Sequence, residues 1–284
     1  MLFCQIFMNE TDTSGQKKRV AIVVALSNRA YLTPGEEISL KHLRHYLGRY
    51  DKYLVMPKSL DFGLDDFNVA RFGDNYFGSV AAHKRLMFSA GYYQEFSDYE
   101  FILTYHLDAL VFSDQLEYWC EKNFDFIGAP WVKHKDAPYN GRKYFENRVG
   151  NGGFCLKKVS SFLKVFNSKK GAIDPDVYWE KFHAHKSLVE RIKNYPKKLL
   201  MGSMRFNNLQ WEMERWGPSE ELFIADRASY YYPEFTIAPL DEALRFGFEC
   251  VPRYCYELNG NRLPFGCHAW ERYDREFWEQ FVLK

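Results

Sequence analysis

The chain has 284 residues, enough for one large α/β domain with a substantial core. Hydrophobic residues make up 46% of it and aromatic residues 18%, which excludes an intrinsically disordered protein. The formal net charge is only +1 and no basic stripe stands out, so nucleic acid is not an expected partner.

Residues 1–18 are predicted to be a disordered leader. The first eight are apolar, but they lack the basic segment of a signal peptide and the length of a membrane span. The six cysteines show no CxxC pair and no regular spacing, which favours a reducing compartment over a zinc site or a secreted disulfide framework. We therefore expect a cytoplasmic protein, with peripheral association to the inner face of a membrane left open.

Alternating strand and helix patterns follow the leader. Residues 20–26 form an unbroken apolar run, typical of a strand that is buried on both faces in a parallel sheet. A helix is predicted next, because Thr33 is a suitable N-cap and Pro34 suits the first helical position. Further strands are expected at residues 51–56, 68–72 and 99–104, with one or two helices over residues 80–96. The alternation predicts an α/β fold with a mostly parallel central sheet flanked by helices.

Two segments stand outside this pattern. Residues 133–148 form a long polar loop with glycine and proline, and such loops are usually functional lids or disordered. Residues 168–215 are charged and helical in pattern, which predicts a helical insertion in a single domain of residues 19–284. Within this insertion, a basic cluster is either a solvated helix end or a contact for anionic lipid or an acidic polymer: Arg191, Lys193, Lys197 and Lys198.

Asp108 is the first candidate for chemistry. It follows the strand at residues 99–104, and ligands of open α/β sheets bind beyond the carboxyl ends of the strands. A carboxylate among apolar neighbours needs a compensating partner, which a divalent cation on phosphate oxygens would provide. The alternatives are a cap of the following turn or an ion pair with a nearby Lys or Arg.

A glycine-rich turn at residues 149–156 is the second candidate. Gly150, Gly152 and Gly153 fall within four residues and run into an apolar strand, so a ligand can approach the backbone closely there. The spacing matches neither a dinucleotide-binding fingerprint nor a P-loop. An ordinary β-turn or bulge is the alternative.

Two further candidates lie towards the C-terminus. Glu220 and Glu221 follow Ser219 in the first turn of a predicted helix, where they either complement the helix dipole or supply a general base. His268 lies in a glycine-containing loop among aromatic residues, and it is either structural or a metal ligand.

Taken in order, these segments resemble an uncharacterised bacterial domain family related to GT-A nucleotide-sugar glycosyltransferases. The resemblance runs from about Arg19 to about Trp278. Its most specific stretches are residues 105–112, 126–131, 149–156 and 252–270. It implies a GT-A-like, Rossmann-like fold, a UDP-linked nucleotide-sugar donor, and a glycan or lipid-linked acceptor.

The resemblance also implies roles for individual residues. GT-A enzymes carry a D-x-D motif that contacts Mn²⁺ or Mg²⁺, and its last position falls on Asp108. His106 stands at its first position, where an imidazole is also a suitable ligand for Mn²⁺. His268 matches the histidine that completes the metal shell. Glu220 and Glu221 match the acidic pair that holds the catalytic base of inverting members, with Glu221 slightly preferred and Glu-Glu replacing the usual Glu-Asp.

Donor-binding residues follow from the same resemblance. The end of the first strand and its turn would hold the nucleotide base and ribose, two cations on the helix before the fourth strand would approach the diphosphate, and the glycine turn would line the sugar. The residues are Ala25, Ser27, Asn28, Arg29, Lys84, Arg85, His106, Leu107, Asp108, Asn151, Gly152 and Gly153.

Two rival functions remain open at this stage. One is a non-catalytic carbohydrate- or nucleotide-binding protein that keeps the fold, which the departures at His106 and Glu221 leave possible. The other is a different nucleotide-dependent α/β enzyme, such as a methyltransferase or dehydrogenase, and the lack of a glycine-rich turn after the first strand counts against it.

Overall fold

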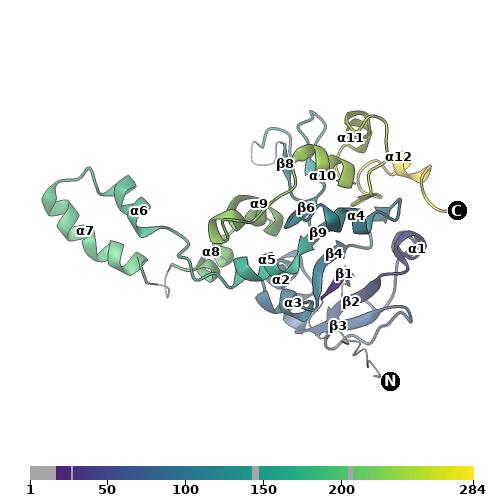
Figure 1. Ribbon diagram of the computed structural model, residues 1–284, viewed down its shortest axis with the longest axis horizontal. Coiled ribbons are helices and arrows are strands. Elements are labelled where there is room, and N and C mark those ends of the chain that lie inside the picture. The colour runs from purple at the N-terminus through teal and green to yellow at the C-terminus, as the bar shows by residue number, and fades with distance from the viewer. Residues whose placement is uncertain (1–16, 27, 143–146, 204–206, 218) are drawn as a thin grey trace, which may run out of the picture.

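A computed structural model describes residues 17–26, 28–142, 147–203, 207–217 and 219–284. A six-stranded sheet lies at its centre, in the order β3-β2-β1-β4-β9-β6 (Figure 1). The strands of this sheet are β1 (Lys18–Ala25), β2 (Asp51–Pro57), β3 (Asn68–Phe72), β4 (Tyr99–Tyr105), β6 (Phe126–Gly128) and β9 (Phe154–Lys158). The first four strands in this order pair in parallel, whereas β9 is antiparallel to both β4 and β6. The predicted α/β class with a mostly parallel central sheet is therefore confirmed.

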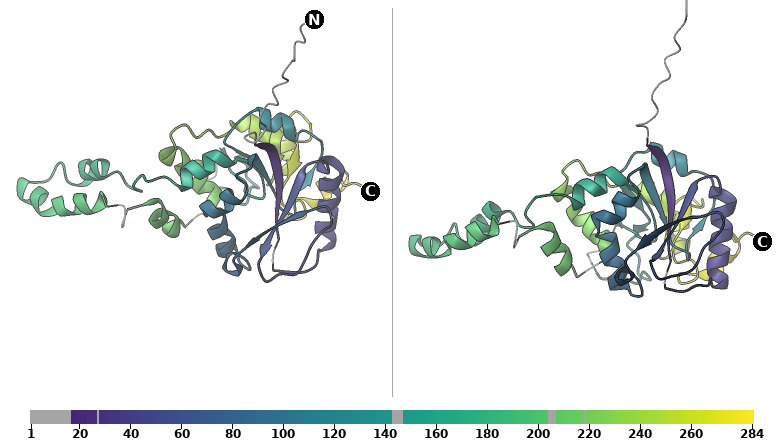
Figure 2. Two further views of the ribbon diagram at one scale, coloured as in Figure 1. Left: turned by 60° about the horizontal axis from the view of Figure 1, so that its bottom comes forward. Right: turned by 90° about the horizontal axis from the view of Figure 1, so that it is seen from below.

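Helices cover both faces of the sheet (Figures 1 and 2). The helices of the described chain are α1 (Pro34–Leu47), η1 (Asp74–Tyr76), α2 (Val80–Met87), α3 (Ala90–Glu95), α4 (Leu116–Glu121), α5 (Val159–Phe166), α6 (Pro175–Phe182), α7 (Leu188–Met201), α8 (Leu209–Arg215), α9 (Glu220–Tyr231), α10 (Leu240–Phe246), α11 (Pro252–Leu258) and α12 (Arg275–Glu279), and of these α6 and α7 lie away from the sheet.

Strand β1 shows why two layers form. Its side chains alternate between the two faces of the sheet. Val20, Ile22 and Val24 pack with the apolar side of α1, whereas Ala21 and Val23 pack with the cluster built by α2, α3, α5 and α9. Because both faces are covered, every residue of the strand from Val20 to Ala25 is apolar.

The predicted start of α1 is confirmed at the level of single hydrogen bonds. The Thr33 side chain accepts from the Glu36 backbone N–H, and the Glu36 carboxylate accepts from the Thr33 N–H, which together form a capping box. Pro34 occupies the first turn, where its missing N–H costs nothing. This helix begins directly after the turn that leaves β1.

Short strands bring the C-terminal segment beside β4. A three-stranded sheet has the order β10-β11-β5, from Gly247–Phe248, Gly266–Cys267 and Leu110–Val111. A separate pair joins β7 (Pro130–Trp131) to β8 (Arg148–Val149). The Trp270 N–H donates to the Asp108 carbonyl over 3.1 Å, so the chain after β11 lies next to the chain after β4.

The predicted helical insertion divides into two parts. Residues 169–203, which include α6 and α7, project from the body as a helical hairpin that we call the arm (Figures 1 and 2). Helix α8 instead packs on the body, where Leu209 and Met213 join the core cluster of Phe223. Among the described residues, no helix combines the length and apolar character needed to cross a membrane.

Candidate active site

The candidate site lies at the carboxyl ends of β1 and β4. After Tyr105 the chain turns sharply, with the His106 N–H donating to the Gly153 carbonyl over 2.7 Å and the Ala109 N–H donating to the His106 carbonyl over 2.9 Å. These two hydrogen bonds fix the backbone on either side of Leu107 and Asp108. Leu107 is buried, whereas the Asp108 side chain remains 47% exposed.

His106, Asp108 and His268 form a compact group of metal-ligating side chains. One ligand atom from each lies within 4.8 Å of the other two. His268 Nε2 lies 3.2 Å from Asp108 Oδ1, and the rings of His106 and His268 meet edge to face at 5.5 Å. The three side chains that were selected from the sequence as metal ligands are therefore brought together from the turn after β4 and the loop after β11.

A second carboxylate orients His268 from behind. Glu249 Oε1 accepts from His268 Nδ1 over 3.0 Å, which directs Nε2 towards Asp108. Asn151 Oδ1 accepts from the backbone N–H groups of Gly153 and Phe154, each over 2.9 Å, so its amide nitrogen faces Glu249 and His268. A carboxylate on the far nitrogen of a ligating histidine fixes its tautomer and ring orientation.

These contacts set the charges of the group. Burial by itself would lower the pKa of His268, but the hydrogen bonds and charges of Asp108 and Glu249 outweigh it and raise this pKa to about 10. Burial by itself would raise the pKa of Asp108, yet the hydrogen bond from His268 prevails and lowers this pKa to about 2. At neutral pH the protein alone thus holds an imidazolium between two carboxylates.

His106 differs from His268 in its state. Burial and the charges of His268 and His83 lower the pKa of His106 to about 3, so its imidazole stays neutral. Its Nε2 atom is buried and has no hydrogen-bond partner among the described residues. A buried imidazole nitrogen with an unused lone pair is suited to a metal ion.

The glycine turn allows these side chains to meet. A Cβ atom on Gly153 would lie 2.0 Å from His268 Nε2, and one on Gly152 would lie 2.1 Å from Glu221 Oε1. Both distances are shorter than any van der Waals contact. The two glycines thus permit His268 and Glu221 to pack directly on the backbone that enters β9.

Glu221 is a titratable side chain of the candidate site that comes from the start of α9. Ser219 occupies the N-cap position of α9, although its side chain makes no capping hydrogen bond. Glu221 Oε2 is buried and has no hydrogen-bond partner among the described residues. Burial first, and then the charge of Glu220, raises the pKa of Glu221 to about 7.

These side chains line two adjoining hollows. The larger hollow, of about 470 Å³, contains Asn28, His83, Glu220 and Glu221 in its wall. The smaller hollow, of about 260 Å³, contains Arg29, Tyr31, Leu107 and Asp108. Ala25, Leu26 and His106 line both, so the hollows meet at the carboxyl ends of β1 and β4.

The two cations selected on α2 have different surroundings. Lys84 donates to the Trp216 carbonyl close to α9. Burial lowers the pKa of Lys84, and the charges of Glu220 and Glu221 partly offset this effect. Arg85 is exposed, donates to the Asn75 carbonyl over 2.6 Å and lines a different hollow. The structure does not bring Arg85 to the candidate site, because the helix turns it away from the sheet.

Among the remaining donor-binding predictions, Ala25 lines both hollows and Asn28 lines the larger one. Arg29 lies in the wall of the smaller hollow and forms an ion pair with Glu36 over 2.5 Å. Ser27 lies outside the described residues.

Sequence reasoning missed three residues of the site: Glu249, His83 and Tyr31. The signal for Glu249 was a single acidic residue between the buried Phe248 and Cys250, which needs a partner. His83 lies on α2 with its ring 5.4 Å from that of His106, one residue before Lys84. Tyr31, which is 64% exposed, carried no local signal.

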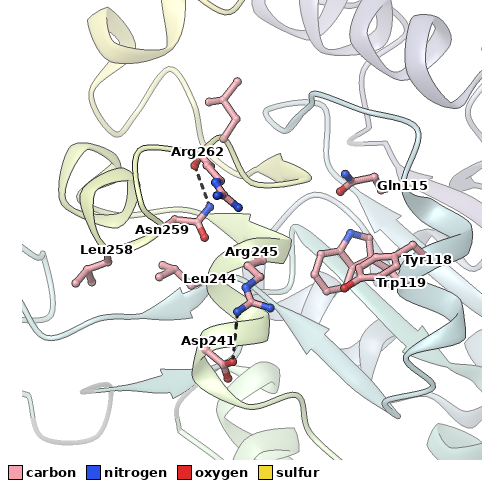
Figure 3. A pocket seen from close by; sticks show the side chains of 10 residues that line it. Gln115, Tyr118, Trp119, Asp241, Leu244, Arg245, Leu258, Asn259 and Arg262 are labelled. Atoms are coloured by element: carbon pink, nitrogen blue, oxygen red, sulfur yellow. Dashed lines mark hydrogen bonds and ion pairs between the residues drawn. The ribbon is translucent and has the colours of Figure 1, made fainter.

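A larger cavity lies elsewhere. It measures about 610 Å³ and is walled by α4, α10 and the loop after α11, with Trp119, Arg245, Leu258 and Arg262 in its lining (Figure 3). None of the residues selected from the sequence borders it. Volume alone therefore does not identify the candidate site, whose convergent titratable groups do.

The histidines and aspartate fit a divalent cation. They offer two imidazole nitrogens and one carboxylate, a donor set suited to Mn²⁺ and to other first-row divalent metals. The unused Nε2 of His106 and the Glu249 hydrogen bond behind His268 are both expected of such a site. Binding would replace the proton on His268 Nε2.

Comparison with solved structures gives distant similarities to glycosyltransferases. The galactosyltransferase LgtC, solved with donor and acceptor sugar analogs, is 12% identical, with 92% of this chain and 94% of that chain covered and a TM-score of 0.47. A glycosyltransferase involved in glycosylation of the major capsid of PBCV-1 is 9% identical, with 93% and 98% covered and a TM-score of 0.45.

The glycosyltransferase GlyE of Streptococcus pneumoniae TIGR4 is a further similar structure. It is 15% identical, with 94% of this chain covered and a TM-score of 0.42. This chain spans 60% of the length of GlyE.

At the level of sequence, no curated protein matches the chain. The family model described as "Protein of unknown function (DUF5672)" matches residues 66–268, which include His106, Asp108, the glycine turn, Glu221, Glu249 and His268. The match covers more than half of the chain, and the protein therefore belongs to the DUF5672 family.

Proposed function

We propose that this protein is a metal-assisted glycosyltransferase that moves a sugar from a nucleotide-sugar donor to an acceptor hydroxyl. One observation carries the proposal: His106 and Asp108, which form a metal-ligating group with His268, line the same connected hollows as Glu221, whose pKa is raised to about 7. Sugar transfer needs both functions, a site for the leaving diphosphate and a base for the acceptor.

The smaller hollow suits the nucleotide. The Tyr31 ring is 64% exposed in its wall and offers a flat surface for a base, and Arg29 lies beside it at 5.2 Å. Asp108 borders the same hollow and His106 lies where it joins the larger one. A nucleoside diphosphate lying in the smaller hollow would thus direct its phosphates at the histidines and Asp108. We propose UDP as the nucleotide.

His106, Asp108 and His268 would hold Mn²⁺ or Mg²⁺. When bound, the cation neutralises the charge that develops on the leaving diphosphate. His106 contributes a neutral imidazole, and Glu249 keeps the His268 ring turned towards Asp108. Gly152 and Gly153 let Glu221 and His268 pack on the backbone of one turn, and this turn would also line the donor sugar.

Glu221 would act as the general base. A base is most effective when its pKa lies near the working pH, and burial raises the pKa of Glu221 to about 7. Its buried, unpartnered Oε2 is available for the proton of an acceptor hydroxyl in the larger hollow. Direct attack by that hydroxyl would invert the anomeric centre. The acceptor is proposed to be a glycan or a lipid-linked sugar.

Calorimetric titration of UDP with and without Mn²⁺ tests the proposal. We expect Mn²⁺ to strengthen UDP binding to the wild type and Asp108→Asn to remove most of this gain, a loss of about tenfold or more because a charged ligand is lost. The matched control is Asp241→Asn, since Asp241 is exposed and lines the unrelated larger cavity.

Two results would contradict the proposal. If Mn²⁺ strengthened UDP binding equally in Asp108→Asn and in the wild type, Asp108 would not be a metal ligand. Purified protein that binds UDP-sugars but neither hydrolyses nor transfers them, while Glu221→Gln binds them equally, would favour a binding protein without catalysis.

A further inference from the structure

The arm exposes an unusual amount of apolar surface. Nine of its large apolar side chains are between 38% and 75% exposed, and helices α6 and α7 have no buried residue. These side chains are Ile173, Val177, Phe182, Leu188, Val189, Ile192, Tyr195, Leu199 and Leu200. Such contiguous exposure marks an interaction surface rather than a folding core.

Helix α7 separates apolar from charged side chains. At about 3.6 residues per turn, Leu188, Ile192, Tyr195 and Leu199 fall on one stripe, with Val189 and Leu200 beside it. Arg191 and Lys198 flank one edge of this apolar face, and Lys193 and Lys197 flank the other. Long basic side chains at the edge of an apolar face can reach past it to polar headgroups.

Charge distinguishes the arm from the rest of the chain. Residues 169–203 contain eight lysines and arginines against four aspartates and glutamates, a formal charge of +4. The whole chain carries only +1, so the remainder is −3. The excess of positive charge therefore coincides with the exposed apolar face.

The arm is a built element with a defined base. The Asn207 side chain is buried, accepts from the Ile173 N–H over 2.8 Å, and donates to the carbonyls of Ile173 and Met201 over 2.7 and 2.6 Å. One side chain thus ties the start of the arm to its end.

Contacts between α6 and α7 leave the apolar face free. Trp179 packs against Tyr195 at 5.7 Å, and Lys198 pairs with Asp176 over 2.5 Å. Both contacts lie on one side of α7, next to the stripe of Leu188, Ile192 and Leu199 and not over it. The hairpin is therefore held together while most of its apolar surface remains exposed.

We propose that the arm docks the protein on an anionic lipid surface. An amphipathic helix with a basic polar face lies in the membrane interface, where apolar burial and attraction to acidic headgroups act together. The charge of +4 favours acidic lipid over the same arm of a second copy, which would repel it. This inference concerns residues away from the candidate active site and does not depend on the proposed chemistry.

Flotation of the purified full chain with vesicles tests the proposal. We expect binding to vesicles of phosphatidylcholine with about one third phosphatidylglycerol, and weak binding to phosphatidylcholine alone, because an acidic lipid surface attracts each basic residue of the arm. Ile192→Gln with Leu199→Gln, and separately Lys193→Glu with Lys197→Glu, should each lower binding about tenfold or more. Glutamine retains helix propensity, so α7 should persist.

Matched controls separate the arm from general surface effects. Tyr118→Gln with Leu258→Gln removes two exposed apolar side chains from other helices, and Lys58→Glu with Lys135→Glu makes the same change in charge elsewhere. Both controls should bind vesicles as the wild type does. The proposal would be overturned if the wild type did not bind the acidic vesicles, or if the arm variants bound them as well as the wild type does. A lipid-free dimer that Ile192→Gln with Leu199→Gln dissociates would also overturn it, because a second copy would then cover the face.

Discussion

At the scale of single residues, burial distinguishes the two glutamates at the start of α9. Glu220 and Glu221 are adjacent in sequence, yet only Glu221 has a buried carboxylate oxygen without a hydrogen-bond partner among the described residues. The backbone of Gly152 packs against the Glu221 carboxylate. Low solvation and the charge of Glu220 then raise the pKa of Glu221 to about 7, the range in which a carboxylate is an effective base.

Substitutions in this pair should change the pH dependence of transfer in different ways. The wild-type rate should rise with pH through about 7, as Glu221 loses its proton. Glu221→Gln should lower the rate by about 10²–10⁴-fold and abolish this rise. Glu220→Gln should keep activity but move the rise to lower pH, because one negative charge beside Glu221 is gone. A Glu221→Gln variant with an unchanged profile would assign the base to another residue.

The same pKa has a consequence for stability. Between the usual pKa of 4.5 and about 7, the folded protein keeps the Glu221 proton that the unfolded chain has released. The free energy of unfolding therefore falls as pH rises through this window. Glu221→Gln should remove this fall. The difference in free energy of unfolding between the variant and the wild type should therefore shift in favour of the variant by on the order of 1–2 kcal/mol from pH 5 to pH 8. Urea unfolding at the two pH values measures it.

At the scale of elements, the glycine turn joins three parts of the chain. It enters β9, which pairs antiparallel with β4, so its backbone lies against the residues that follow β4. Asn151 in the same turn faces Glu249 and His268, which follow β10 and β11. The antiparallel direction of β9 is thus what carries the turn to the carboxyl end of β4.

Adding one methyl group to this turn should disturb the site. In Gly153→Ala, the new Cβ would overlap His268 Nε2 at 2.0 Å and push the ring away from Asp108. We expect Mn²⁺-dependent UDP binding to fall about tenfold or more, as for other losses of ligand geometry. Gly63→Ala is the matched control, because no atom lies within 4 Å of its added Cβ. Unchanged binding by Gly153→Ala would show that His268 does not need this position.

At the scale of the whole molecule, the arm and the body are separate in packing. The arm lacks buried residues in α6 and α7, whereas α8 already belongs to the core. Regions with few buried contacts open locally at less cost than global unfolding. The base at Asn207 is therefore the point at which the arm is coupled to the body.

Loss of the Asn207 side chain should loosen the arm without unfolding the body. Asn207→Ala leaves the Ile173 N–H and the carbonyls of Ile173 and Met201 without their partner, at a cost of about 1–3 kcal/mol. We expect trypsin to cleave within residues 174–200 about tenfold faster, while the main thermal transition stays nearly constant. Asn194→Ala, which removes one hydrogen bond within α7, is the control. A large drop in the temperature of the main thermal transition would instead show that the arm unfolds together with the core.

The local sequence determined most of the secondary structure. The apolar run of β1, the capping box of α1 and the limits of β3 follow from patterns within a few residues, so each could be predicted without knowledge of distant contacts. The class of fold follows from their alternation. His106, Asp108 and His268 could be selected because of their residue types and their order along the chain.

Only the tertiary structure decided how these parts act together. The carboxylate behind His268, the burial that separates Glu221 from Glu220 and the turning of Arg85 away from the site all depend on residues that are distant in sequence. The exposed face of α7 is a further case, because an apolar stripe in a helix normally predicts burial and here its large apolar side chains remain about half exposed or more. Patterns along a sequence report which residues prefer to be buried, whereas pKa values and interaction surfaces depend on what actually surrounds them.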